Sequence, residues 1–209
     1  MYTFGMAGSE QAFDPLILLI LAIFFDGYVG EMRGLMRFIK HPVALIGDLV
    51  DFLDRKLNRD KRGDMDRAIR GALTVVIVVT ASGAVGVGIA WLTLNHTFGW
   101  VLELILLTLL LAGRSLYDHV KEVAKALEIG LEPGRQAVAQ IVGRDPQQLD
   151  IHGVCRAAIE SCAENLCDGV VAPVFWYVLF GFPGLIIYKS VNTMDSMIGH
   201  KNAKYRAFG

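Results

Sequence analysis

Apolar and charged stretches alternate along this chain. The apolar stretch from Gly71 to Leu94 carries no charged residue, and as a helix it is long enough to cross a hydrocarbon layer of about 30 Å. Two shorter apolar stretches, 13–29 and 100–113, contain only Asp14, Asp26 and Glu103 as charged residues. The pattern predicts transmembrane helices over residues 13–29, 71–94 and 100–113.

Local signals refine these three helices. Asp14 followed by Pro15 is typical of a helix start, whereas Asp26 at the membrane boundary is equally compatible with capping and with a functional role. The turn Asn95–Gly99, with Trp91 and Trp100 on either side, indicates a helical hairpin with an aromatic belt. Small residues of the stretch 71–94 would let another helix approach closely; they are Ala81, Gly83, Ala84, Gly86 and Gly88.

The last apolar stretch, residues 170–191, is interrupted by Pro173, Gly181, Pro183 and Gly184. Lys and Arg concentrate in residues 31–70, 114–168 and 189–206, and the positive-inside rule places all three segments on the cytoplasmic side. A re-entrant or broken helix hairpin over 170–191 satisfies that placement, whereas a plain span would carry the last cations outside. We therefore expect the hairpin, a multi-pass protein of the cell inner membrane, and a site facing the cytoplasm.

Composition supports a membrane protein and does not indicate a particular binding partner. The hydrophobic fraction is 54% and the mean hydropathy is +0.45, above the values usual for soluble domains. A net charge of -1 favours no nucleic acid. The three cysteines match neither a redox nor a zinc motif and predict reduced thiols. The fold class expected is all-α, a polytopic membrane protein with helical cytoplasmic segments, forming a single domain over residues 1–209.

Candidate chemistry concentrates between residues 156 and 168. Arg156, Glu160, Glu164 and Asp168 recur every four residues, so a helix places them in one stripe. A solvated helix face is the plain interpretation. Asn165 beside these carboxylates, at the edge of the apolar stretch, instead favours a magnesium and phosphate site, since Mg²⁺ commonly takes one or two carboxylates plus substrate phosphates. Asp168-Gly169 is expected to end this helix.

A second polar cluster follows the apolar stretch. Asn192, Asp195, Ser196 and Gly199 would share one helical face, and Lys189 could contact a phosphate as a point charge. A helix capped by Asn192 or Thr193 is the alternative.

Further candidates lie upstream. Gly143-Arg144-Asp145-Pro146 is a turn by composition, and Arg114, His119 and His41 lie just outside the predicted spans. No P-loop, HExxH, GxSxG or dinucleotide fingerprint is present.

Several strings together resemble the adenosylcobinamide-phosphate synthase family. They are His41-Pro-Val, Arg114-Ser-Leu-Tyr-Asp-His119, Val142-Gly-Arg-Asp145, Ala158-Ile-Glu-Ser161, Ala163-Glu-Asn165, Asp168-Gly-Val-Val-Ala-Pro-Val-Phe-Trp176, Tyr188-Lys189 and Asn192-Thr-Met-Asp-Ser-Met197. The resemblance runs in order from about Asp26 to the last residue. It also implies that the chain ends before a C-terminal segment that is usual in the family.

The resemblance implies a ligase of cobalamin (vitamin B12) biosynthesis. ATP as cosubstrate and Mg²⁺ would support amide formation between adenosylcobyric acid and (R)-1-amino-2-propanol O-phosphate, or the free amino alcohol, giving adenosylcobinamide phosphate. Its partners would be the corrinoid, the amino-alcohol phosphate, ATP, membrane lipid and other enzymes of the pathway.

Chemistry then suggests roles within such a site. Magnesium and phosphate would be bound by Glu160, Glu164, Asp168 and Asp195, with Asn165 and Asn192 for orientation. Substrate and phosphate contacts would come from Arg144, Asp145, Lys189, Ser196, Arg114, His119 and His41. A non-catalytic membrane sensor or accessory protein of the same superfamily is the alternative, although it need not keep these polar residues. A small transporter would carry ionisable residues near the midplane of its spans, and the stretch 71–94 has none.

Overall fold

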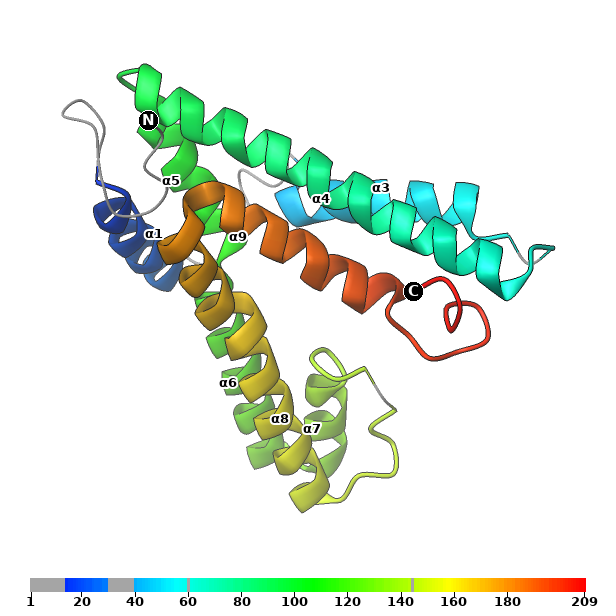
Figure 1. Cartoon of the computed structure of the whole chain (residues 1–209). Coiled ribbons are helices and arrows are strands. Elements are labelled where there is room, and N and C mark those ends of the chain that lie inside the picture. Colours follow the sequence, from blue (N-terminus) through cyan, green and yellow to red (C-terminus); the bar gives the residue numbers. More distant parts are fainter. Residues whose placement is uncertain (1–13, 30–39, 60, 144) are drawn as a thin grey trace.

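A computed structural model describes residues 14–29, 40–59, 61–143 and 145–209, and all regular structure in these ranges is helical (Figure 1). The elements are α1 (Pro15–Val29), α3 (Pro42–Leu57), α4 (Asp64–Asn95), α5 (Gly99–Leu110), α6 (Gly113–Ile129), α7 (Leu131–Val138), α8 (Ile151–Leu166), the π-helical turn η1 (Cys167–Val171) and α9 (Ala172–Ile198). The all-α prediction is confirmed.

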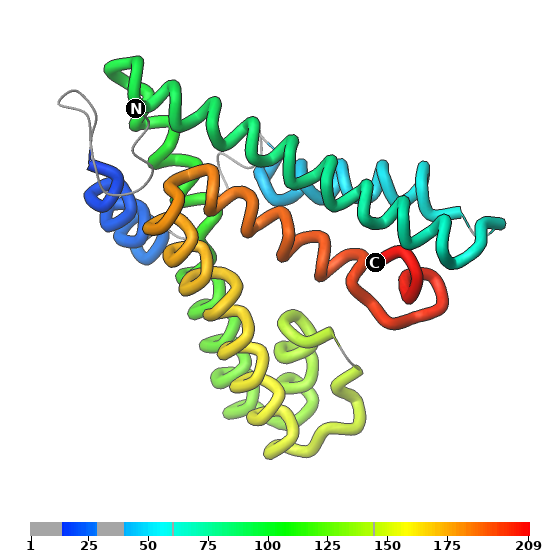
Figure 2. Tube along the Cα trace, viewed as in Figure 1, coloured from blue at the N-terminus to red at the C-terminus, as the bar shows by residue number. Residues whose placement is uncertain are grey.

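The helices form two arms that meet at an angle, as the chain trace shows (Figure 2). In one arm α3, α4 and the second half of α9 lie side by side; in the other α6, α7 and α8 do, and α1 and α5 lie where the arms join (Figure 1). Each arm has its own core. The larger one includes Leu18, Val78, Leu107 and Leu185, and the smaller one lies around Val123, Val138 and Val154.

Three helical stretches are long and apolar enough to cross a membrane: α4, residues 99–129 and residues 151–198. The predicted span 71–94 lies inside α4, and the turn at residues 96–98 separates it from α5 as expected. Extended backbone at Leu111 ends α5 before α6 begins. The predicted span 13–29 corresponds to the shorter apolar helix α1, whose first turn is capped by the Asp14 carboxylate accepting from the Leu16 N–H at 2.8 Å.

Close approach of α4 and α9 depends on glycine. A Cβ on Gly86 would lie 2.6 Å from the Cα of Pro183, so only glycine fits this crossing without a backbone shift. Four residues earlier on α4, Ser82 and Ser190 share a hydrogen bond of 2.6 Å between their hydroxyls. The prediction of small residues at a helix contact is confirmed at Gly86, whereas a Cβ added to Gly88 would meet nothing within 4 Å.

The predicted break in the last apolar stretch occurs at Gly181. Its φ of 64° and ψ of -158° lie where L side chains are rarely found, and the helix changes direction there (Figure 1). Beyond the break the chain runs antiparallel to α4, since Pro183 lies at Gly86, Ser190 at Ser82 and Phe208 at Gly71. Residues 170–191 are therefore a broken helix that turns back along α4.

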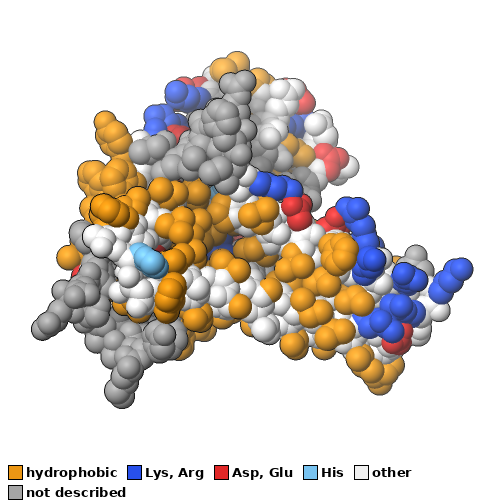
Figure 3. Space-filling view, turned by 90° about the horizontal axis from the view of Figure 1, so that it is seen from above, with side chains coloured by type: hydrophobic (Ala, Val, Ile, Leu, Met, Phe, Trp, Pro, Cys, Tyr) orange, Lys and Arg blue, Asp and Glu red, His pale blue; other side chains and the backbone are white. Residues whose placement is uncertain are grey.

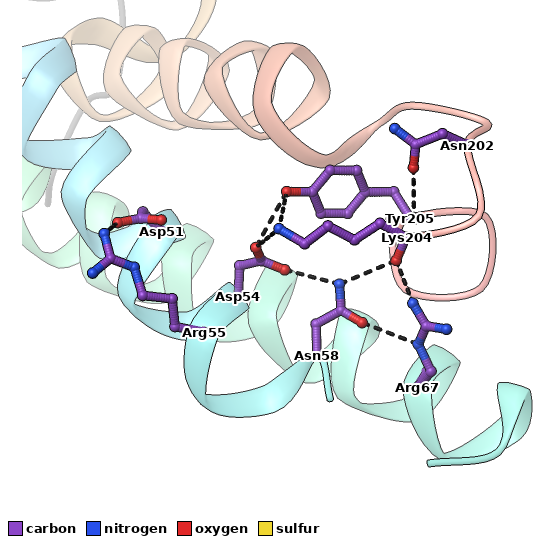
Figure 4. A network of polar contacts seen from close by, with 8 residues as sticks. All are labelled: Asp51, Asp54, Arg55, Asn58, Arg67, Asn202, Lys204 and Tyr205. Atoms are coloured by element: carbon purple, nitrogen blue, oxygen red, sulfur yellow. Dashed lines mark hydrogen bonds and ion pairs between the residues drawn. The ribbon is translucent and has the colours of Figure 1, made fainter. Parts of the chain in front are cut away.

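The tail after α9 is hydrogen-bonded to the end of α3 and the start of α4 (Figure 4). Lys204 Nζ donates to Asp54 Oδ2 at 2.7 Å, and the Tyr205 hydroxyl donates to the same oxygen at 3.2 Å. Asn58 donates to Asp54 and Arg67 donates to Asn58. The bond to Asp54, followed by the one to Tyr205, raises the pKa of Lys204 above its ordinary value, so the ammonium stays charged at neutral pH and loses its proton only at strongly alkaline pH.

Charge is distributed unequally along the first arm. Lys and Arg gather at the end that holds the loop between α3 and α4 (Figure 3), and the tail brings Lys201, Lys204 and Arg206 to this end. No charged residue occurs from Trp91 to Trp100 at the opposite end of α4. The cations near the end of the predicted segment 31–70 and those that follow α9 thus meet, within the described residues, at one end of the molecule.

Two buried carboxylates tie the arms together where they join. Asp26 Oδ2 accepts from the backbone N–H of Gly113 at 2.8 Å and of Arg114 at 3.3 Å, so Asp26 caps the start of α6. Glu103 accepts from the Tyr177 hydroxyl at 2.7 Å, joining α5 to α9. Both carboxylates are less than a tenth exposed.

Candidate functional site

Asp168 lies in the π-helical turn η1, and Pro173 explains why the helix widens there. Proline has no N–H to donate, and the Ala172 N–H donates to Cys167 O, five residues back. The carbonyl of Asp168 then lacks a donor from the helix and has Lys189 Nζ at 3.5 Å, while the carbonyl of Gly169 accepts from the Ala112 N–H at 3.1 Å. The prediction that the helix ends at Asp168-Gly169 is wrong, because the chain passes through η1 into α9.

The side chain of Asp168 is held by two donors from the second half of α9. Tyr188 donates its hydroxyl to Oδ1 at 3.3 Å, and Asn192 donates Nδ2 to Oδ2 at 2.9 Å. Lys189 is 8% exposed, so its ammonium lies in the same buried region between the two halves of the broken helix. We refer to Asp168, Tyr188, Lys189 and Asn192 as the hinge cluster.

The hinge cluster corrects one local prediction. Neither Asn192 nor Thr193 caps a helix, because α9 continues through both residues. The Asn192 amide reaches back to Asp168, and the Thr193 hydroxyl donates to Lys189 O at 2.7 Å, one turn earlier. Asn192, a member of the predicted second polar cluster, thus forms a hydrogen bond with Asp168 of the acidic stripe.

The other two carboxylates of the stripe border a separate polar cavity of about 240 Å³ between α8 and the segment after α7. Glu160 and Glu164 line it together with Ser161 and Asn165. Asn165 Nδ2 donates to Ser161 O at 2.8 Å and to Ser161 Oγ at 3.0 Å, and Ser161 Oγ donates to Ile141 O. We refer to Glu160, Ser161, Glu164 and Asn165 as the α8 pocket.

The predicted magnesium ligands do not converge on one point. Among the described residues no three His, Cys, Asp or Glu side chains lie close enough to hold a metal ion together. Glu160 and Glu164 remain a pair of exposed carboxylates beside the Asn165 amide. Two carboxylates and an amide fit Mg²⁺ when substrate phosphates and waters complete its shell.

The other predicted site residues are spread around these two groups. Asp195 and Ser196 are exposed on the last turns of α9, where the Ser196 hydroxyl donates to Asn192 O at 3.0 Å. Asp145 accepts from the Gln147 N–H at 3.0 Å, as expected for a turn. Arg144 lies outside the described residues.

Arg114, His119 and His41 have local structural contacts. Arg114 Nε donates to Asp118 at 2.9 Å and Nη1 donates to Gly27 O at 3.2 Å, and the start of its helix packs on η1 through the bond from Ala112 to Gly169. His119 Nδ1 lies 2.7 Å from Ser115 O. His41 caps α3 by accepting from the Val43 N–H at 3.2 Å.

Tyr188 enters the sequence analysis only in the string Tyr188-Lys189, and no role in the site was predicted for it. Its ring borders an apolar groove between α4 and α9, while its hydroxyl reaches Asp168. A polar side chain inside an apolar stretch, directly before Lys189, was the available signal. The three cysteines are free thiols, as predicted.

The fold and these sites define a helical protein with apolar helices that could span a membrane and a polar site at the bend of its last helix. A family model described as "CobD/Cbib protein" matches residues 19–209. The chain belongs to this family.

Curated relatives agree with the family. A "Cobalamin biosynthesis protein CobD" of Sinorhizobium sp. is 47% identical over 203 residues, covering 93% of this chain and 61% of the relative. Proteins of the same name from Rhizobium meliloti and Rhodobacter capsulatus are 45% and 43% identical, with 94% and 92% of this chain and 61% and 60% of the relative covered. The chain thus spans about three fifths of their length. No solved structure matches it.

Proposed function

We propose that this chain acts in cobalamin biosynthesis, as an ATP-dependent ligase that joins an amino-alcohol phosphate to a carboxylate of adenosylcobyric acid. The observation that carries the proposal is the hinge cluster, in which a carboxylate, an amide, a hydroxyl and a buried ammonium from sequence positions 168–192 are brought together. Membership of the CobD/Cbib family supports the pathway.

Amide formation needs the corrinoid carboxylate to become a good electrophile. Transfer of the γ-phosphoryl group of ATP would form an acyl phosphate and release ADP. The amine nitrogen would then attack the acyl carbon, losing a proton as the C–N bond forms and inorganic phosphate leaves. Magnesium, when bound by Glu160, Glu164 and Asn165 with substrate phosphates, would neutralise charge on the transferring group.

The residues of the hinge cluster suit distinct parts of this reaction. Asp168 is fixed by Tyr188 and Asn192, and a fixed carboxylate can receive the proton that the attacking amine loses. When protonated, Lys189 places a positive charge in a buried position, where its attraction for a phosphate is screened less than at the surface.

A direct assay tests the proposal. Purified protein in detergent would be incubated with adenosylcobyric acid, aminopropanol phosphate, ATP and magnesium, and the product followed by mass. Product mass appearing only when all four components are present is the expected result. Absence of product, with the fold intact, would favour the sensor or accessory role instead.

We also propose that the cationic end of the first arm faces the cytoplasm, across the inner membrane of the cell. The antiparallel return of α9 supports this, because it brings the tail to the loop between α3 and α4. Single cysteines at Arg59, Gln147 and Lys201 in a cysteine-free background should all react with a reagent applied from the cytoplasmic side. Labelling of position 201 only from outside would contradict the re-entrant arrangement.

A further inference from the structure

An apolar groove of about 570 Å³ lies inside the bend of α9. Its walls come from three segments: Gly83 and Val87 of α4, Trp176 and Phe180 before the break at Gly181, and Ile187 and Tyr188 after it. The volume falls within the range of small-molecule pockets, about 300–1,000 Å³. The bend therefore creates a binding-sized space as well as a change of direction.

Aromatic side chains form one wall of this groove. The rings of Trp176 and Phe180 are stacked, with centroids 5.6 Å apart and planes inclined by 23°. They are 37% and 46% exposed, so part of each ring remains available to a ligand. Stacked aromatic faces of this kind suit a flat, largely apolar ring system.

The groove is continuous with the hinge cluster through one residue. The ring of Tyr188 lines the groove, and its hydroxyl donates to Asp168 at 3.3 Å. Lys189, the next residue, is the buried ammonium of the same cluster. A ligand in the groove would have its apolar part on the aromatic wall, and a polar substituent that extends past Tyr188 would approach Asp168.

We propose that this groove seats the corrin macrocycle, with one edge of the ring against Trp176 and Phe180. This inference rests on the proposed function, since it identifies which substrate occupies this side of the hinge cluster. A corrinoid combines a flat ring bearing methyl groups with side chains that end in amides and a carboxylate. Such a molecule places the reacting carboxylate at the polar edge when its ring enters the groove.

Two exposed valines on α4 provide a matched test. Val87 lines the groove and is 50% exposed, whereas Val85 is 55% exposed and is not among the lining residues. Val87→Trp should fill the groove, and Val85→Trp should add the same bulk elsewhere on the helix. The probe is adenosylcobyric acid, titrated in lipid nanodiscs without ATP or magnesium. We expect Val87→Trp to weaken binding about tenfold or more, and Val85→Trp to leave it unchanged.

The outcomes separate this inference from the proposed function. Unchanged affinity in Val87→Trp, with amide product still formed by the unmodified protein, would remove the corrin from the groove and leave the ligase proposal in place. Loss of co-purifying phospholipid in that variant, without loss of corrinoid affinity, would assign the groove to an acyl chain. Failure of the unmodified protein both to bind the corrinoid and to form product would overturn the two proposals together.

Discussion

Asp168 of the hinge cluster and Glu164 of the α8 pocket lie on successive turns of one helical run, yet their carboxylates are held differently. Asp168 accepts from two side chains of α9. Glu164 is exposed, and in the described part of the chain no hydrogen bond or ion pair to its carboxylate is found. Two carboxylates of the same stripe can therefore suit different tasks. The fixed carboxylate of Asp168 suits the orientation of a substrate, and the adaptable carboxylate of Glu164 suits a hydrated metal ion.

Replacing Asp168 with Asn should give the largest effect. The amide keeps the shape of the side chain and can still accept from Asn192, so the fold should survive while the negative charge is lost. Loss of one positioned electrostatic contact typically lowers the rate about 10²–10³-fold. Product mass per unit time measures this, together with the thermal midpoint.

The matched control for Asp168→Asn is Glu122→Gln, which neutralises an exposed carboxylate on α6 and should leave turnover as it was. Full turnover in Asp168→Asn, with an unaltered magnesium requirement, would eliminate the hinge cluster as the reacting centre and direct attention to Asp195 and Asp145.

Asn192→Ala should have the next largest effect, on stability and on rate. The variant leaves Asp168 without its shorter hydrogen bond, and a bond to a charged group contributes about 1.5–3 kcal/mol. Because Asn192 is half-buried, we expect the lower end of that range, measured by denaturant unfolding in detergent. Asn95→Ala, which removes an exposed amide bonded to Trp91 O, is the control; equal losses in both variants would show that Asn192 does not hold Asp168.

Glu164→Gln should act on magnesium rather than on the fold. We expect the magnesium concentration for half-maximal turnover to rise about tenfold, with turnover largely restored at high magnesium. Asp168→Asn, in contrast, should stay slow at every magnesium concentration. If Glu164→Gln merely relieves repulsion along the stripe, stability rises by about 0.2–0.5 kcal/mol and the magnesium requirement does not move.

Most helices could be predicted from the sequence because their causes are local. An uncharged stretch from Gly71 to Leu94 is enough to predict the core of α4, and Asp14 with Pro15 is enough to predict the start of α1. The helix end expected at Asp168 failed for a tertiary reason. The carbonyls freed by Pro173 find donors in Ala112 and Lys189, which the local sequence does not reveal.

The candidate site was predicted in composition but not in arrangement. Asp168, Lys189 and Asn192 were all expected, yet their mutual contact depends on the reversal of the chain at Gly181. Tyr188 was missed because its partner lies twenty residues earlier. His41 caps α3. A histidine directly before a proline is equally compatible with helix capping and with ligand binding, so the sequence did not decide between the two roles.

The π turn also limits how this protein can change over evolutionary time. A π turn holds one more residue than an α-turn, so deleting one residue between Cys167 and Val171 would remove the widened turn that leaves the carbonyls of Asp168 and Gly169 to Lys189 and Ala112. Point substitutions in α8 leave this geometry untouched. We therefore expect this segment to tolerate substitutions far better than insertions or deletions. Changes of length should be confined to places such as the turn around Pro146.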